Sequence, residues 1–156
     1  MNSPMSSGFG RFSGDDVTSS MSARRKARKR ALDVLYEADL RHSPITDALA
    51  AYVERLPEPK PEQLGYTVAL AEGVATHLDR IDELIASYAE GWTIDRMPVV
   101  DRNLARIAVY ELIYRDEIDD PVAITEAVEL ARTLSTEDSP RFLNGVLARI
   151  AEYTAH

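Results

Sequence analysis

The sequence predicts an all-α fold of about seven helices. Apolar residues recur with the period of an α-helix through most of the chain. Pro and Gly fall mainly between these stretches, and no segment shows the alternation typical of a strand. The chain has 156 residues, of which 45% are hydrophobic and 28% charged, a composition that suits one globular domain.

The first predicted helix spans residues 22–41. Its apolar residues at positions 31, 32, 35 and 38 share one face, and neither Gly nor Pro occurs from 23 to 40. Residues 1–21 are rich in Ser and Gly and have no hydrophobic period, so we expect a disordered N-terminal tail. Residues 22–156 then form a single all-helical domain. Met21, directly before the helix, is an alternative start of the protein.

Caps and helix breakers divide the rest of the domain. We expect the further helices at about residues 44–56, 62–90, 99–115, 121–134 and 139–153. The second of these is so long that a bend or break is expected near residues 77–79. Within it Gly65, Ala69 and Gly73 lie four apart on one face, a spacing that lets another helix approach closely. The helix that follows is the most apolar and is predicted to lie at the centre.

The strongest local signal is the basic run Arg24-Arg25-Lys26-Ala27-Arg28-Lys29-Arg30. The whole chain carries 18 Lys and Arg against 26 Asp and Glu, a net charge of −8. Without the run, 12 basic residues would face 26 acidic ones, a net charge of −14. Cations this dense repel one another unless an anion lies near. A polyanion would offset that repulsion, and nucleic acid is the usual one.

Helical geometry places part of the run beside an aromatic residue. At about 100° per residue, Arg25, Lys29 and Tyr36 fall within about 40° of one another. Cations for phosphates beside a ring for a base suit single-stranded RNA. Three other interpretations stay open. Tyr36 can be a half-buried core residue beside a solvated charged face, and the run can be a membrane-surface helix or a nuclear-import signal.

Signals for catalysis and cofactors are weak. The chain has no Cys, which excludes disulfides, thiol catalysis and Cys-bound zinc. None of the three His has a partner at metal-ligand spacing, and phosphate-binding Gly motifs are missing. The carboxylate pairs Asp79 with Glu83 and Glu126 with Glu129 are what chance gives in so acidic a chain. We therefore expect a binding protein without cofactor, not an enzyme. No apolar run suggests a membrane span or signal peptide, so a cytoplasmic location is expected.

Four ordered groups of residues carry a family resemblance. They are Ala23–Arg28 leading into Ala31, Leu32, Leu35 and Tyr36; Glu72–Thr76; Arg106–Leu112; and Val122–Ala131 followed by Glu137–Leu147. Over about residues 22–153 the chain resembles the NusB family of transcription antitermination factors. The resemblance implies an all-helical fold of two packed three-helix subdomains. The extended basic run and the unaligned loop at 89–98 depart from the pattern.

The resemblance also implies a function and partners. The family binds the boxA element of nascent ribosomal RNA together with NusE, a small-subunit ribosomal protein. The pair joins the RNA polymerase elongation complex through other Nus factors and suppresses premature termination. Neither catalysis nor a cofactor is implied. Some relatives self-associate, so monomer and homodimer both stay open. The rival hypothesis is a protein-interaction module whose dimer covers the basic run.

Residue by residue, the resemblance assigns two surfaces. The expected RNA-binding residues are Arg24, Arg25, Lys26, Arg28, Tyr36, Asp138 and Phe142, to which helical geometry adds Lys29. The expected NusE surface consists of Asp101, Arg102, Leu104 and Glu111. Simpler roles stay open for three of them. Phe142 shares an apolar stripe with core positions, and Asp101 and Asp138 can be acids that favour a helix N-terminus.

Overall fold

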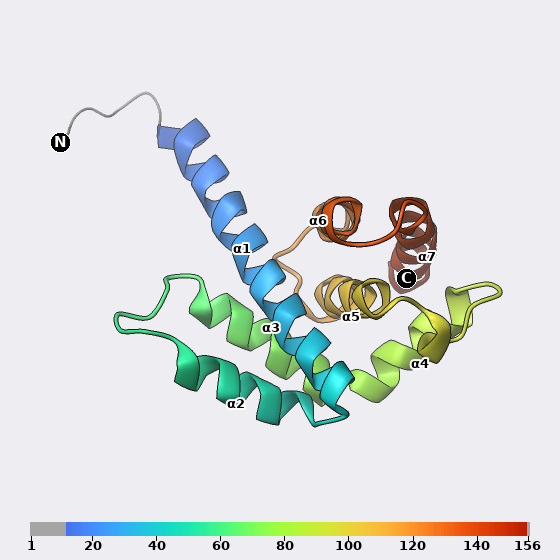
Figure 1. The fold of residues 1–156 in the computed structure, drawn as a ribbon. Helices are drawn as coiled ribbons and strands as arrows, with labels where there is room; N and C mark the ends of the chain where they lie inside the picture. Colours follow the sequence, from blue (N-terminus) through green and yellow to red (C-terminus); the bar gives the residue numbers. More distant parts are fainter. Residues whose placement is uncertain (1–11, 156) are drawn as a thin grey trace.

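Seven α-helices and one short 3₁₀ helix make up the regular structure of residues 12–155 (Figure 1). The computed structural model describes the backbone of these residues and the side chains of residues 23–155. The elements are α1 Phe12–Arg41, α2 Ile45–Arg55, α3 Leu64–Thr76, α4 Leu78–Tyr88, η1 Ile94–Arg96, α5 Val99–Tyr114, α6 Asp120–Leu134 and α7 Ser139–Thr154. The predicted all-α class is confirmed. Among the described residues, no helix is both long and apolar enough to cross a membrane.

Helix α1 begins at Phe12, ten residues before the predicted start. Part of the segment predicted as a tail is therefore helical. The disorder predicted for residues 1–11 concerns a segment outside the described residues.

The predicted break in the long third stretch is confirmed. Helix α3 ends at Thr76 and α4 starts at Leu78, with His77 between them at φ −110° and ψ 21°. Figure 1 shows the chain changing direction there, so that α4 leaves the line of α3. The break turns α4 toward the C-terminal helices, where it packs on α5 and α7.

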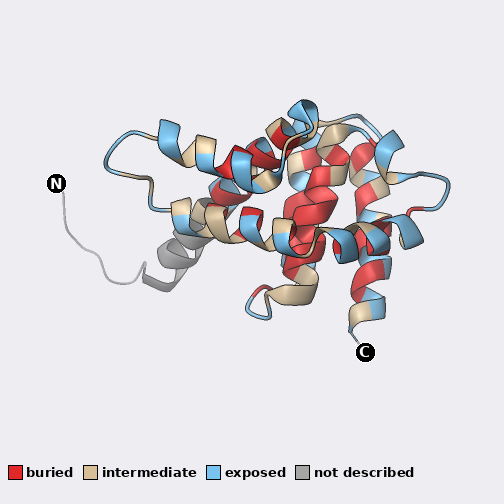
Figure 2. Cartoon of the chain, turned by 90° about the horizontal axis from the view of Figure 1, so that it is seen from below, coloured by how far each residue is buried: buried red, intermediate tan, exposed pale blue. Residues whose placement is uncertain are grey.

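The helices form two groups of three, and α5 belongs to one group and also packs against the other. Helices α1, α2 and α3 pack on one another, as do α5, α6 and α7. Both α1 and α3 also contact α5. Every residue of α5 from Asn103 to Glu111 is buried, and Figure 2 shows this helix as the most deeply buried element. The predicted central position of this helix and the two three-helix subdomains are confirmed.

Of the two glycines predicted for close packing, only Gly73 lies at a crowded contact. A Cβ on Gly73 would lie 2.1 Å from the ring of Tyr110, which α5 presses against α3. No atom lies within 4 Å of a Cβ built on Gly65. The close-approach prediction therefore holds at Gly73 and fails at Gly65, which is exposed near the start of α3.

This difference gives a matched pair of substitutions. Gly73→Ala should destabilise the protein by about 1–3 kcal/mol, because Tyr110 must move within a packed core. Gly65→Ala should be neutral or stabilising by up to about 1 kcal/mol, since Ala restricts the unfolded chain. Urea unfolding followed by circular dichroism measures both. Equal midpoints for the two variants would contradict the packing described.

Candidate nucleic-acid interface

The rotation of α1 divides the basic run between solvent and interior. Arg25, Lys26 and Arg30 are exposed, whereas Ala27 and Arg28 are buried. Both buried positions continue the apolar face that packs α1 on α3 and α5. The run is therefore not one continuous basic surface, because one of its cations belongs to the interior.

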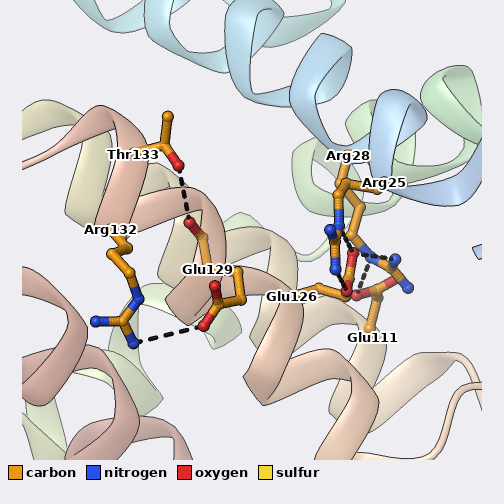
Figure 3. A network of polar contacts seen from close by, with 7 residues as sticks. All are labelled: Arg25, Arg28, Glu111, Glu126, Glu129, Arg132 and Thr133. Atoms are coloured by element: carbon orange, nitrogen blue, oxygen red, sulfur yellow. Dashed lines mark hydrogen bonds and ion pairs between the residues drawn. The ribbon is translucent and has the colours of Figure 1, made fainter. Parts of the chain in front are cut away.

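Arg28 lies in a buried network with two carboxylates (Figure 3). Its Nε donates to both carboxylate oxygens of Glu111 at 3.0 Å, and its Nη1 donates to Oε1 of Glu126 at 3.4 Å. Its Nη2 lies 2.9 Å from Oε2 of Glu111 as an ion pair without hydrogen-bond geometry. Burial alone would lower the pKa of Arg28, but its hydrogen bond to Glu111 and the charges of Glu111, Tyr66 and Glu126 together outweigh burial and raise that pKa. Arg28 is therefore charged in the interior.

Tyr66 of α3 completes this network. Its hydroxyl donates to Oε2 of Glu111. Burial and the charge of Glu111 raise the pKa of Tyr66, so the hydroxyl remains protonated. Guanidinium groups of Arg24, Arg28 and Arg115 lie 5.2, 5.9 and 5.3 Å from the centre of the ring. The network thus joins α1, α3, α5 and α6.

Two residues that were predicted to lie at the binding surfaces are therefore buried. Arg28 is 3% exposed and Glu111 is 1% exposed, so neither presents a surface to RNA or to a protein partner. From the sequence, a polyanion was the expected counter-charge of the basic run. Glu126 was not predicted as a partner, because it is distant in sequence and lies on the inner face of α6.

The exposed cations line a groove between α1 and α6. A hollow of about 410 Å³ is bordered by Arg25, Lys26, Lys29, Arg30, Gln63, Leu130, Thr133 and Leu134. The α1 wall is basic, and the α6 wall is largely apolar. Such a groove can bind phosphates on one side and contact bases or sugars on the other.

The four cations of the groove differ in how they are paired. Arg25 contacts Glu126 at two points, 3.0 and 2.6 Å, and Lys29 lies 2.8 Å from Asp33. Lys26 and Arg30 have no ion-pair partner within residues 23–155. Their charges are the ones most available to a polyanion.

Arg24 and Tyr36 lie on α1 outside the groove. Arg24 stacks over Tyr66 and lines a separate hollow of about 170 Å³ that includes Glu117 and Asp119. It therefore does not share the groove with its neighbours in the run. Tyr36 is 38% exposed. Part of the Tyr36 ring is therefore accessible on α1, while the rest is covered by its neighbours.

A second hollow lies at the start of α7. About 430 Å³ is lined by Trp92, Met97, Pro98, Asp101, Thr136, Asp138, Ser139 and Phe142. The rings of Trp92 and Phe142 meet edge to face, with centres 6.3 Å apart. Phe142 is half-buried against the core, and Asp138 is exposed. Trp92, which is 49% exposed, was missed from sequence because it lies within a loop without a recognisable motif.

The predicted partner surface on α5 is mostly interior. Asp101 and Leu104 are 3% and 1% exposed. Asp101 accepts hydrogen bonds from the hydroxyls of Ser135 and Ser139 at 2.5 and 2.8 Å. The surface assignment is thus wrong for Asp101 and Leu104, as it is for Glu111. Asp101 is an acid in the first turn of α5 that also ties the α6–α7 turn to α5.

Arg102 is the remaining member of the predicted partner surface, and it is partly exposed. Its Nε donates to Oδ2 of Asp39 at 2.8 Å, and Asn103 donates to the same oxygen. Burial opposes the charge of Asp39, but these donors outweigh burial and lower its pKa. The pair links α1 to α5.

Arg28→Ala should lower the free energy of unfolding of the protein, and not only weaken the binding of a ligand. It leaves Glu111 with its charge buried and only Tyr66 as a donor, a change that typically costs about 3–5 kcal/mol. Lys29→Ala, which removes an exposed pair one residue away, should cost less than about 1 kcal/mol. Denaturant titration compares them. Similar losses in the two variants would mean that Arg28 does not hold the interior together.

Comparisons with known proteins agree on one family. A model of the NusB family matches residues 25–152. The chain is 77% identical over 133 residues to transcription antitermination protein NusB of Salinispora arenicola, covering 85% of this chain and 98% of that protein. For NusB of Beutenbergia cavernae the identity is 53% over 137 residues, with 83% and 90% covered.

Solved structures agree with this result. T. maritima NusB superposes with a TM-score of 0.77 at 35% identity and covers 85% of this chain and 93% of its own. NusB and NusE solved in complex with dsRNA give a TM-score of 0.75 at 29% identity, with 85% and 98% covered. Since the family match spans nearly all of the described domain, the chain belongs to the NusB family.

Proposed function

We propose that this protein is a transcription antitermination factor that binds boxA-like RNA together with NusE. The basic groove between α1 and α6 carries this proposal, because Lys26 and Arg30 face a hollow that also has an apolar wall. Membership of a family whose members are named transcription antitermination proteins supports it. So does the complex of a related NusB with NusE and double-stranded RNA.

The RNA contacts divide into direct phosphate ligands and base contacts. Lys26 and Arg30 bind phosphates, while Arg25 and Lys29 join them once released from their carboxylates. Tyr36 offers an exposed ring farther along α1. Asp138, Phe142 and Trp92 form a second contact region at the hollow before α7. No reaction or cofactor is part of this function.

The partners follow from the same proposal. NusE joins the protein on RNA, and Arg102 is the one accessible member of the predicted partner surface. The complex acts in the cytoplasm on nascent ribosomal RNA through RNA polymerase and the other Nus factors. The free protein is a monomer or a homodimer, which light scattering distinguishes.

The direct test is fluorescence anisotropy with a labelled boxA-like RNA and a scrambled RNA, with and without NusE. Lys26→Ala/Arg30→Ala should weaken RNA binding at least tenfold and reduce the salt slope by about 1.5, since two phosphate contacts are lost. Arg132→Ala, which removes an exposed cation of α6 outside the groove, is the matched control. Unchanged binding by the double variant would exclude the groove. A stable dimer that binds no RNA even with NusE would favour the interaction-module hypothesis.

Trp92 provides a separate test of the second contact region, because it is the only Trp of the chain. Its fluorescence should be quenched when RNA binds, since a base stacked on the indole ring quenches the excited state of that ring. Phe142→Ala should reduce the quenching and weaken binding about three- to tenfold, as one stacking contact is lost. Tyr153→Ala, an exposed ring at the far end of α7, serves as control. Saturating RNA with no spectral change would exclude this region.

A further inference from the structure

We propose that Glu126 is an internal competitor of the RNA backbone. It holds Arg25 in the free protein, and Arg25 transfers from Glu126 to an RNA phosphate when RNA enters the groove. This inference rests on the proposed function and identifies what sets the affinity of that same site. It concerns one side chain that the sequence showed only as part of a carboxylate pair on the helix surface.

The geometry of Arg25 resembles the way in which arginine binds a phosphate. Its Nε donates to Oε1 of Glu126 at 3.0 Å and its Nη2 to Oε2 at 2.6 Å (Figure 3). A phosphate offers the same two acceptor oxygens to the same fork of donors. While Glu126 occupies these donors, Arg25 cannot give both of them to RNA.

Exposure makes this pair exchangeable. The side chain of Arg25 is 51% exposed and lines the groove, whereas that of Glu126 is 4% exposed. RNA can therefore approach the guanidinium from the solvent side while the carboxylate stays in place. The hydrogen bond from Arg25 to Glu126 and the charge of Glu126 raise the pKa of Arg25, which remains a cation in either state.

Release of Arg25 does not leave Glu126 without a partner. Nη1 of Arg28 lies 3.4 Å from Oε1 of Glu126, and Arg28 is held in place by Glu111. Two arginines thus face two glutamates, and the buried members of this set keep one another paired. A buried carboxylate that lost its only cation would destabilise the protein strongly. The second contact, from Arg28, therefore makes the exchange feasible.

The test is RNA affinity of Glu126→Gln measured over a range of salt concentrations. Gln keeps the shape of the side chain but loses its charge, so Arg25 becomes available. RNA binding should become about three- to tenfold tighter, and the salt slope should steepen by about 0.7–0.9, as expected for one more phosphate contact. In an Arg25→Ala background the same substitution should have no such effect.

The control is Glu129→Gln, one turn farther along α6. It removes the same charge near the groove, but Glu129 pairs with Arg132 and makes no hydrogen bond to Arg25. Circular dichroism confirms that each variant is folded. Equal gains from both variants would mean a general charge effect and overturn the proposal.

Three further outcomes separate the proposals. Weaker binding by a folded Glu126→Gln, with wild-type protein still binding, would show that Glu126 orients Arg25 for RNA and would overturn the competitor role. If neither protein binds RNA with NusE present, the proposed function itself fails and the competitor role fails with it. The competitor role would also be overturned if Arg25→Ala weakened RNA binding while Glu126→Gln left RNA affinity unchanged.

Discussion

The ion network of Arg28, Glu111 and Glu126 fixes how α1 sits on the rest of the protein. It joins α1 to α5 and α6, and Tyr66 adds α3. Burying an ion pair adds little net stability relative to apolar packing, but a partly unpaired buried charge is expensive. The network therefore adds little to the stability of the observed orientation of α1. It mainly destabilises other rotations of the helix, because these would leave a buried charge unpaired. With Arg28 turned inward, the helical period turns Lys26 and Arg30 toward solvent.

This arrangement explains how an acidic protein presents a basic groove. Two acidic residues that pair with the run, Glu111 and Glu126, lie in the interior, where they balance the charges of Arg25 and Arg28. The surface keeps the remaining cations opposite an α6 wall that includes Leu130 and Leu134. A basic wall can follow a nucleic-acid backbone, and the apolar wall beside it can contact bases or sugars.

Asp101 shows how an interior residue can organise a distant surface. Its carboxylate binds the hydroxyls of Ser135 and Ser139, which flank the turn between α6 and α7. Ser139 directly follows Asp138, and Phe142 lies in the next turn of the helix. Through these contacts Asp101 fixes the start of α7 on α5, and so the position of the hollow that Trp92 closes.

The sequence by itself determined the helical class, the break at His77, the central place of α5 and the basic character of α1. These follow from local periods, breakers and charge density, which neighbouring residues set. It could not determine the depth of each polar residue, because that depends on partners far away in the chain. Arg28 and Lys26 look alike in sequence, yet Arg28 is buried against Glu111, 83 positions away, whereas Lys26 is exposed. The same holds for Asp101 and Glu111, whose burial was decided by tertiary packing.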